Sequence, residues 1–136
     1  MEWQKDSYTV SDDITKLDIK MIHDFLTNCY WAKGRTQDVV VESIQNSFAL
    51  GLYHNEQQIG FARAITDYST FAYLCDVFVL EEYRRKHLGH FLMECLFNHP
   101  KLSAVKWLLK TTDAKSLYQD FNFKELESPL GWMLRR

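Results

Sequence analysis

A basic turn between an apolar run and an amphipathic helix is the segment best suited to bind a ligand. Arg84, Arg85 and Lys86 follow closely on the apolar run 71–80, and a helical pattern of apolar residues begins at Leu88. A turn that opens a helix leaves backbone N–H groups without partners at the positive end of the helix dipole, where phosphate groups bind. The three cations strengthen that field, so the segment predicts a local pyrophosphate site. The alternative is a solvated basic turn.

A single carboxylate interrupts the apolar run. Asp76 is the only charged residue between Phe71 and Leu80. Burial of a carboxylate is costly unless the group is paired, hydrogen-bonded or used in chemistry. Asp76 is therefore either a hydrogen-bonded structural group or a candidate general base, and the sequence leaves both open.

The segment 30–35 is a second candidate region. It contains Tyr30, Trp31 and Arg35 and reads as a loop between two helices. Two aromatic rings and a guanidinium group can hold an amine that also carries a carboxylate or a phosphate. In the alternative interpretation, Trp31 covers the core and Arg35 lies on the surface.

The elements that position these residues follow from the spacing of apolar residues. Apolar residues three and four apart indicate helices, and β-rich runs between turn residues indicate strands. Helices are predicted over 17–30, around Val40 and Ile44 up to Ser47, over 88–96 and over 114–122, and strands over 8–10, 48–53, 59–66, 71–80 and 105–109.

The order of these elements predicts a mixed α/β sheet. An antiparallel meander is followed by strand, helix, strand, helix and a last strand, which Met133 and Leu134 are expected to form, so one step is parallel. The almost wholly apolar run 71–80 is expected to be a central strand buried on both faces. A length of 136 residues fits one domain, 1–136.

Two motifs resemble those of the GNAT superfamily of acetyl-CoA-dependent N-acetyltransferases. The segment from Arg84 to Gly89 is similar to the Arg/Gln-x-x-Gly-x-Gly/Ala loop that follows a strand, with His87 in place of the first Gly. A histidine there either contacts a phosphate through its ring or adopts the required backbone angles at some cost. Residues 114–123 are similar to the Ala-x-x-Leu-Tyr-x-x-x-Gly-Phe helix, with Asn122 in place of Gly, and Asn tolerates a left-handed conformation. The resemblance covers roughly residues 10–134.

The resemblance implies a GNAT-like α/β fold: a mixed, mostly antiparallel central sheet with a parallel splayed step, flanked by about four helices. It also implies acetyl-CoA as co-substrate. The pantetheine arm is expected to fill the splay and to bond to the backbone of Phe78, Val79 and Leu80. The residues expected around the phosphates are Arg84, Arg85, Lys86, His87, Leu88, Gly89 and His90.

The resemblance also assigns a catalytic role to Tyr118. The thiolate that departs from the thioester leaves more readily when it is protonated, and a tyrosine hydroxyl beside the sulfur can supply the proton. The alternative is that Tyr118 only packs against the apolar face of its helix. For the base, Tyr73 stands about where many relatives carry a Glu, so Asp76 or a chain of water molecules is the candidate. Asp113 is expected to cap the Tyr118 helix.

The expected reaction is direct transfer of an acetyl group to a primary amine, on a small molecule or a protein, within a ternary complex. The substrate-binding residues are expected to be Tyr30, Trp31 and Arg35. Because His87 departs from the motif and the strand Glu is missing, a non-catalytic acyl-CoA-binding sensor is the alternative. A homodimer is compatible with the sequence.

Composition excludes other classes. The 16 basic and 18 acidic residues give a formal charge of −2, which disfavours a nucleic-acid or anionic-membrane partner, including a nucleic-acid module built on residues 84–86. The three cysteines, Cys29, Cys75 and Cys95, sit in apolar runs and are expected to be buried free thiols. The histidines have no metal-binding spacing, so no metal is expected. With neither a signal peptide nor a membrane span in the pattern, we expect a cytoplasmic protein.

Overall fold

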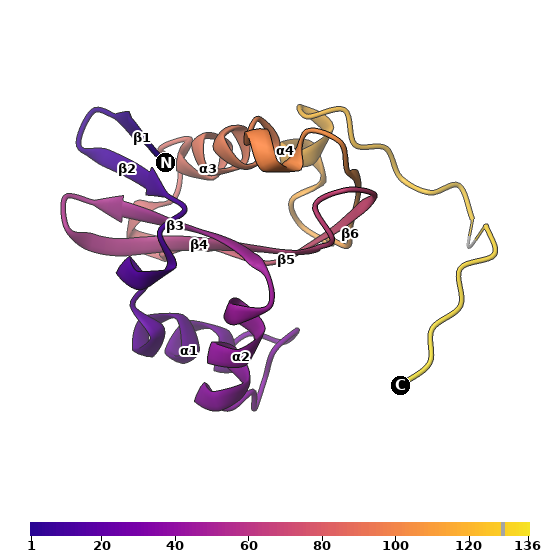
Figure 1. Cartoon of the computed structure of the whole chain (residues 1–136), viewed down its shortest axis with the longest axis horizontal. Helices are drawn as coiled ribbons and strands as arrows, with labels where there is room; N and C mark the ends of the chain where they lie inside the picture. The colour runs from indigo at the N-terminus through magenta and orange to yellow at the C-terminus, as the bar shows by residue number, and fades with distance from the viewer. Residues whose placement is uncertain (129) are drawn as a thin grey trace.

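The computed structural model describes residues 1–128 and 130–136 of the chain. Within these residues, six strands form one sheet in the order β1-β2-β3-β4-β5-β6. The helices α1 and α2 cover one face of the sheet, and α3 and α4 cover the other (Figure 1). The strands are β1 (Glu2–Lys5), β2 (Tyr8–Ser11), β3 (Phe48–His54), β4 (Gln57–Thr66), β5 (Phe71–Val79) and β6 (Lys106–Leu109). The α-helices are α1 (Ile19–Thr27), α2 (Gln37–Gln45), α3 (Leu88–Phe97) and α4 (Lys115–Gln119).

The sheet topology confirms the predicted α/β fold. Strands β1 to β5 pair with their neighbours in antiparallel fashion, and β5 pairs with β6 in parallel. The parallel step follows because α3 carries the chain across one face of the sheet between the end of β5 and the start of β6.

The two faces of the sheet have separate apolar cores. On one face, Ile22 and Leu26 of α1 and Val40 and Ile44 of α2 pack against Phe61 and other residues of the central strands. On the other face, the apolar stripe of α3 packs against β2, β3 and β4. The capping residues of the first two helices, Asp18 and Thr36, accept hydrogen bonds from the backbone N–H groups of Met21 and Val39.

Burial on both faces falls on strands other than the one predicted. Nearly all residues of β3 and β4 are buried, whereas β5 alternates between buried and half-buried residues. The two central strands lie beneath both helix layers. β5 pairs with β6 only from Phe71 to Leu74, so it has a neighbour on its outer side along only part of its length. Every second side chain of β5 is therefore only half-buried.

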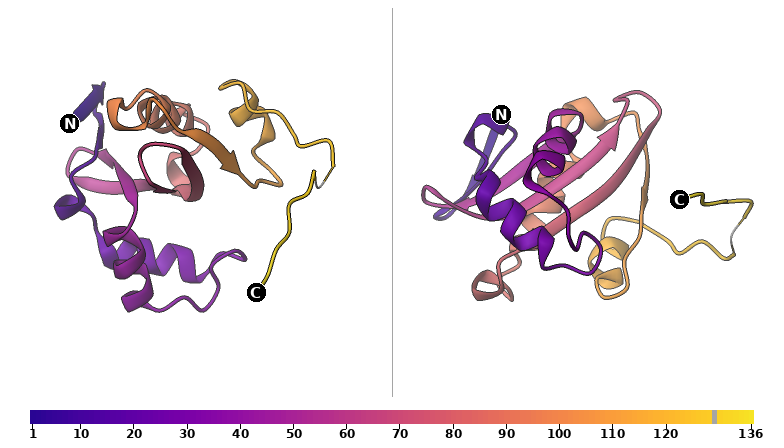
Figure 2. Two further views of the ribbon diagram at one scale, coloured as in Figure 1. Left: turned by 45° about the vertical axis from the view of Figure 1, so that its right-hand side comes forward. Right: turned by 90° about the horizontal axis from the view of Figure 1, so that it is seen from below.

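The C-terminal segment corrects a second expectation. Met133 and Leu134 form no strand and are 96% and 79% exposed. All three views show the segment extending away from the sheet (Figures 1 and 2). Two of the cysteine predictions also need correction, because Cys29 and Cys75 are only half-buried, while Cys95 is buried; all three are free thiols.

The strand predicted over 8–10 is confirmed as β2, and it forms a hairpin with β1, which the sequence did not predict. Strand β1 is mostly exposed and lacks an apolar alternation, so its sequence did not indicate a strand.

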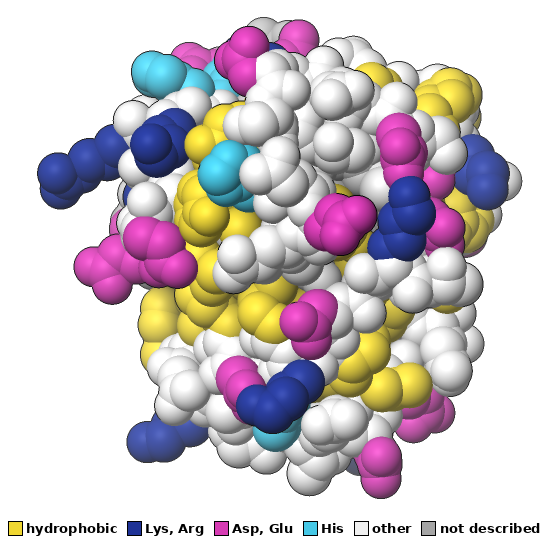
Figure 3. Space-filling view, turned by 90° about the vertical axis from the view of Figure 1, so that its left-hand side faces the viewer, with side chains coloured by type: hydrophobic (Ala, Val, Ile, Leu, Met, Phe, Trp, Pro, Cys, Tyr) yellow, Lys and Arg dark blue, Asp and Glu magenta, His cyan; other side chains and the backbone are white. Residues whose placement is uncertain are grey.

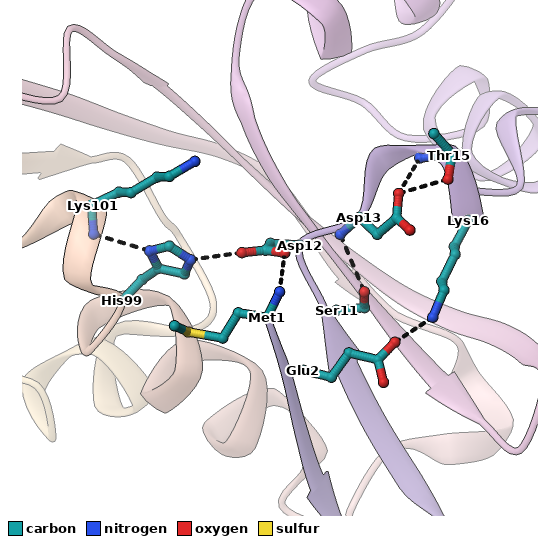
Figure 4. Close-up of polar contacts among 9 residues, drawn as sticks. All are labelled: Met1, Glu2, Ser11, Asp12, Asp13, Thr15, Lys16, His99 and Lys101. Atoms are coloured by element: carbon teal, nitrogen blue, oxygen red, sulfur yellow. Dashed lines mark hydrogen bonds and ion pairs between the residues drawn. The ribbon is translucent and has the colours of Figure 1, made fainter.

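The chain leaves the hairpin at Asp12, whose carboxylate accepts hydrogen bonds from the N-terminal ammonium group (2.8 Å) and from Nε2 of His99 (2.8 Å) (Figure 4). The backbone N–H of Lys101 donates to Nδ1 of His99, so Nε2 carries the ring proton. Burial by itself raises the pKa of Asp12, but these hydrogen bonds outweigh it and hold the pKa below its ordinary value.

None of the helices formed by residues 1–128 and 130–136 combines the length and the apolar character that crossing a membrane requires.

Candidate functional site

The two parallel strands part halfway along β5. The register pairs Phe71 to Leu74 of β5 with Lys106 to Leu109 of β6 and then ends. From Cys75 to Val79, β5 pairs only with β4 on its other side. The backbone of this stretch therefore presents a free strand edge, which can donate and accept hydrogen bonds to an extended ligand.

A β-bulge lies immediately after the point where the strands part. Arg63 of β4 faces Cys75, and Phe61 faces Phe78, so Asp76 and Val77 stand opposite a single residue. Asp76 has φ = 53°, in the left-handed region. A bulge bends its strand and increases the local twist, which accounts for the divergence of β5 from β6 at this residue.

The basic turn follows the free edge and leads directly into α3. Nε of Arg84 donates a hydrogen bond to the carbonyl oxygen of Val79 (3.0 Å), which folds the turn back onto the end of β5. The side chains of Arg84, Arg85 and Lys86 are exposed. In α3 the first helical bond runs from the N–H of Phe91 to the carbonyl of His87 (3.1 Å). The preceding N–H groups therefore have no partner within the helix, as an anion site requires.

The backbone at His87 explains the motif departure. His87 has φ = 60° and occupies the N-cap position of α3 without a side-chain capping bond. Glycine adopts this conformation freely, whereas other residues adopt it at a cost of about 1 kcal/mol. Of the two alternatives at His87, the structure shows the left-handed backbone. Asn122 likewise has φ = 69° after α4, as expected for a residue in the place of Gly.

Tyr118 of α4 lies against the core on the α3 side of the sheet. It is 7% exposed and belongs to the apolar cluster that contains Leu74, the last paired residue of β5, and Leu88, the first residue of α3. Burial raises the pKa of Tyr118 to about 12, so its hydroxyl is protonated at neutral pH. That hydroxyl forms no hydrogen bond with any of the described residues. Asp113 does not cap the helix: Ala114 holds the N-cap position, and its N–H donates to Oγ1 of Thr111 (3.1 Å).

A buried charge cluster lies on the opposite face, at the bulge. Oδ2 of Asp76 accepts hydrogen bonds from Nη1 of Arg35 (2.7 Å) and Nε of Arg63 (2.9 Å). Oδ1 of Asp76 accepts from Nε1 of Trp31 (3.2 Å), and Nη1 of Arg63 donates to Oγ of Ser47 (3.0 Å). The side chain of Asp76 is 2% exposed. We call these five residues the Asp76 cluster. The bonds favour the structural interpretation of Asp76, whose carboxylate is held by two cations and an indole.

The cluster fixes the loop 30–35 over the sheet. Trp31 and Arg35 come from this loop, and Asp76 comes from β5, 41 residues beyond Arg35. Tyr30 extends from the same loop to Thr112, beyond the end of β6, where the two hydroxyl oxygens are 3.3 Å apart. The loop therefore contacts β5 and the segment that follows β6. Tyr30 is 73% exposed and Trp31 is 43% exposed, so their rings are open to a ligand.

Sequence reasoning missed Arg63 and Ser47. Arg63 is the only charged residue in the predicted strand 59–66, just as Asp76 is in its neighbour. A single basic residue in one apolar strand and a single acidic residue in the next could have predicted that the two pair with each other. For Ser47, at the end of α2, the sequence carried no comparable signal.

Two hollows border these elements. One cavity of ≈ 580 Å³ is lined by Phe25 and other residues of α1, by Cys29 just after this helix, and by Leu80 after β5. Phe25 stacks on Phe78 with ring centroids 3.9 Å apart, so α1 is packed directly on the free stretch of β5. A groove of ≈ 500 Å³ lies along β6, and Tyr118 is among its lining residues.

The surface at the hairpin end of the sheet shows a band of hydrophobic side chains bordered by charged ones (Figure 3).

The cysteines have the properties of inert thiols. Burial raises the pKa of Cys75 to about 11, although Arg63 and Arg35 act in the opposite direction, and burial raises the pKa of Cys95 to about 12. The thiolate is the reactive form, so neither residue is suited to carry an acyl group. In the part of the chain that is described, no three His, Cys, Asp or Glu side chains come close enough together to hold a metal ion.

Comparisons with known proteins identify the fold and its relatives. The sequence profile described as acetyltransferase (GNAT) domain matches residues 45–125. A crystal structure of a GNAT-family protein from Xanthomonas campestris pv. campestris is 38% identical, with a TM-score of 0.91 over 95% of this chain and 92% of that one. A protein of Gibberella zeae, provisionally described as an acetyltransferase, is 29% identical over 85% of this chain and 78% of its own length. A GNAT-family acetyltransferase from Elizabethkingia anophelis, solved with acetyl-CoA bound, shares the fold at 16% identity, with a TM-score of 0.61 over 86% of this chain and 76% of that one.

Proposed function

This chain belongs to the GNAT family of acetyltransferases, and we propose that it transfers an acetyl group from acetyl-CoA to a primary amine by direct attack within a ternary complex. The observation that carries the proposal is the free edge of β5 from Cys75 to Val79, which begins at a bulge and is followed by the basic turn and by the start of α3 with its unpaired helical N–H groups. An extended arm with a pyrophosphate at one end and a thioester at the other matches that arrangement.

The donor end is assigned to the basic turn and the start of α3. The N–H groups of Leu88, Gly89 and His90 point along the helix axis toward the phosphates, and Arg84, Arg85, Lys86 and His87 surround them. Gly89 leaves room here, because a Cβ at this position would meet only a side-chain carbon of Leu117, at 3.8 Å. The backbone of Phe78, Val79 and Leu80 is assigned to the pantetheine amides.

The leaving group is assigned to Tyr118. Its hydroxyl is protonated and has no protein partner to compete for its proton among the described residues, and its ring packs in the apolar cluster that contains Leu74, where β5 parts from β6. Donation of that proton to the sulfur makes the thiol, rather than the thiolate, the departing group.

The acceptor amine is assigned to the face that carries Tyr30, Trp31 and Arg35. An alkylammonium must lose a proton before it attacks. Because the oxygens of Asp76 already accept three hydrogen bonds, we assign this step to a chain of water molecules and give Asp76 the task of holding Trp31 and Arg35 in place.

The proposal is tested by incubating the protein with acetyl-CoA and a panel of primary amines, some of them neutral, and measuring both free thiol and acetylated amine. We expect acetylated product in molar equivalence with released CoA. We also expect CoA at about 100 times its dissociation constant to stabilise the protein by about 2.7 kcal/mol, seen as a rise of several degrees in melting temperature.

The site within the protein is tested with Arg84→Glu, which places a negative charge beside the phosphates. Its CoA affinity is expected to fall by roughly tenfold to a hundredfold, while Lys101→Glu, a charge reversal at another exposed position, serves as the control. A melting curve that millimolar CoA leaves unchanged, together with no product from any amine, would contradict the proposal.

A further inference from the structure

The Asp76 cluster has a net charge of +1, because it contains two arginines and one carboxylate. Arg35 and Arg63 both pair with Asp76, and no other acidic side chain in residues 1–128 and 130–136 lies within ion-pair distance of either arginine. The side chains of Arg35 and Arg63 are only 21% and 9% exposed. A cation held out of water without a full counter-charge is unfavourable, so the cluster attracts one further negative group.

Both guanidinium groups also have N–H donors that form no hydrogen bond with the described residues. Arg35 uses only Nη1, and Arg63 uses Nε and Nη1, for hydrogen bonds to residues that the structure describes. Nη2 of both residues and Nε of Arg35 are left for a ligand. Two planar guanidinium groups that share one carboxylate partner are well suited to grip a second carboxylate with parallel hydrogen bonds.

The position of the cluster ties it to the acceptor. Asp76 lies two residues beyond Leu74, where β5 parts from β6, and the exposed rings of Tyr30 and Trp31 lie in the loop above it. We propose that the Asp76 cluster is a carboxylate-binding site and that the acceptor is a small primary amine bearing one carboxylate, gripped by the free donors of Arg35 and Arg63. This inference rests on the proposed function.

The charge balance favours a carboxylate over a phosphate. With the acceptor in the form that attacks, its amine uncharged, one carboxylate brings the sum of charges over Arg35, Arg63, Asp76 and that carboxylate to zero. A phosphate monoester, with about −1.5 to −2 charges at neutral pH, leaves the buried cluster with an excess of negative charge. Arg63 keeps its pairing with Asp76 when Arg35 is replaced by a neutral residue, so such a variant retains a balanced pair and is expected to fold.

The test compares matched acceptors: ω-amino carboxylates of two to five carbons, their amides, and the corresponding aminoalkyl phosphates. The wild-type protein is expected to use the best carboxylate with a kcat/KM at least tenfold above that of its amide and above that of the phosphate. In Arg35→Gln this carboxylate-to-amide ratio is expected to fall toward one. In Lys33→Ala, which removes an exposed charge from the same loop, the ratio is expected to persist.

Binding is measured separately from transfer. In protein saturated with CoA, the preferred carboxylate is expected to raise the melting temperature of the wild type and of Lys33→Ala but not of Arg35→Gln, and its amide is expected to raise none of them. If amides or phosphates are used as well as carboxylates, or if the ratio survives in Arg35→Gln, the inference is wrong while the acetyltransferase function stands. If no amine is acetylated, the proposed function fails instead, and the melting temperatures still decide whether a carboxylate binds.

Discussion

The donor side and the acceptor side of the site are built in different ways. The donor side runs through consecutive residues, from the free edge of β5 through the basic turn to the first turn of α3. The acceptor side gathers Trp31 and Arg35 from a loop, Ser47 from the end of α2, Arg63 from β4 and Asp76 from β5. In this account the pyrophosphate is bound by backbone groups that are close together in the sequence. The acceptor is bound by residues that only the folded chain brings together.

The difference predicts that changes on the two sides affect different quantities. The donor side depends on backbone groups, on the exposed basic side chains of residues 84–86 and on the Tyr118 hydroxyl, so its variants are expected to change turnover or CoA affinity with little loss of stability. The acceptor side depends on a buried ion network, so its variants are expected to change stability together with acceptor use.

The largest expected effect is that of Tyr118→Phe. The ring stays in its apolar cluster and only the proton donor is lost, so kcat is expected to fall by about 10²–10⁴-fold with little change in melting temperature. Since the pKa of Tyr118 is about 12, the hydroxyl stays protonated up to about pH 10, and the loss is expected to be the same at neutral and mildly alkaline pH.

Tyr53→Phe is the matched control for this variant. Tyr53 is also buried, burial also raises its pKa to about 12, and its hydroxyl likewise has no hydrogen-bond partner in the part of the chain that the structure describes. Its kcat is expected to equal that of the wild type. Full turnover in Tyr118→Phe would mean that Tyr118 only packs in the core and is not the proton donor.

The second effect is on stability. Asp76→Ala leaves two largely buried arginines without their carboxylate, and loss of one partner from a buried ion network costs about 3–5 kcal/mol. At 136 residues this corresponds to a fall in melting temperature of roughly 10–20 °C. The control is Asp38→Ala, at an exposed position in the first turn of α2, where a much smaller change is expected. Equal melting temperatures for the two variants would mean that the cluster does not hold the acceptor side together.

The sequence predicted the two sides unequally for the same reason. The basic turn and Tyr118 lie in motifs whose residues are neighbours along the chain, so spacing alone was enough to single them out. The partnership of Asp76 with Arg35 and Arg63 depends on the register of β4 against β5 and on a bulge, and neither can be derived from local spacing. The strand predicted over 8–10 is present as β2, but β1 was missed because it is mostly exposed and has no apolar alternation. The C-terminal segment was misjudged because apolar residue type alone does not decide which stretches pair.

A smaller effect concerns strain on the donor side. His87→Gly removes a side chain from a left-handed position and is expected to stabilise the protein by up to about 1 kcal/mol, with CoA affinity retained or increased. Asn122→Gly, at a second left-handed position, is the control and is expected to gain less, because Asn tolerates this conformation. A melting temperature that falls in His87→Gly would show that the histidine ring contributes more than its backbone costs.

The smallest effect lies outside both sides, in the turn between β4 and β5. The carboxylate of Asp67 accepts hydrogen bonds from the hydroxyl of Thr70 and from the backbone N–H groups of Thr70, Ser69 and Phe71, which hold the pKa of Asp67 well below its ordinary value of 3.8. A pKa that is depressed in the folded state contributes stability above about pH 4, and that stability is lost as the pH falls further.

Asp67→Asn is therefore expected to melt at a lower temperature than the wild type at pH 7, and the difference is expected to shrink as the pH is lowered below about 4. Turnover is expected to be unaffected. Glu56→Gln, at an exposed position in the turn between β3 and β4, is expected to change neither quantity. A difference between Asp67→Asn and the wild type that is independent of pH would assign the effect to packing.

The central claim is that the free edge of β5 and the start of α3 hold the donor with its sulfur beside Tyr118. The most direct measurement is a crystal structure of the protein grown with CoA. We expect the pyrophosphate at the N–H groups of Leu88, Gly89 and His90, the pantetheine amides on the backbone of β5, and the sulfur within hydrogen-bond reach of the Tyr118 hydroxyl. A CoA molecule bound elsewhere, or bound here with its sulfur far from Tyr118, would contradict it.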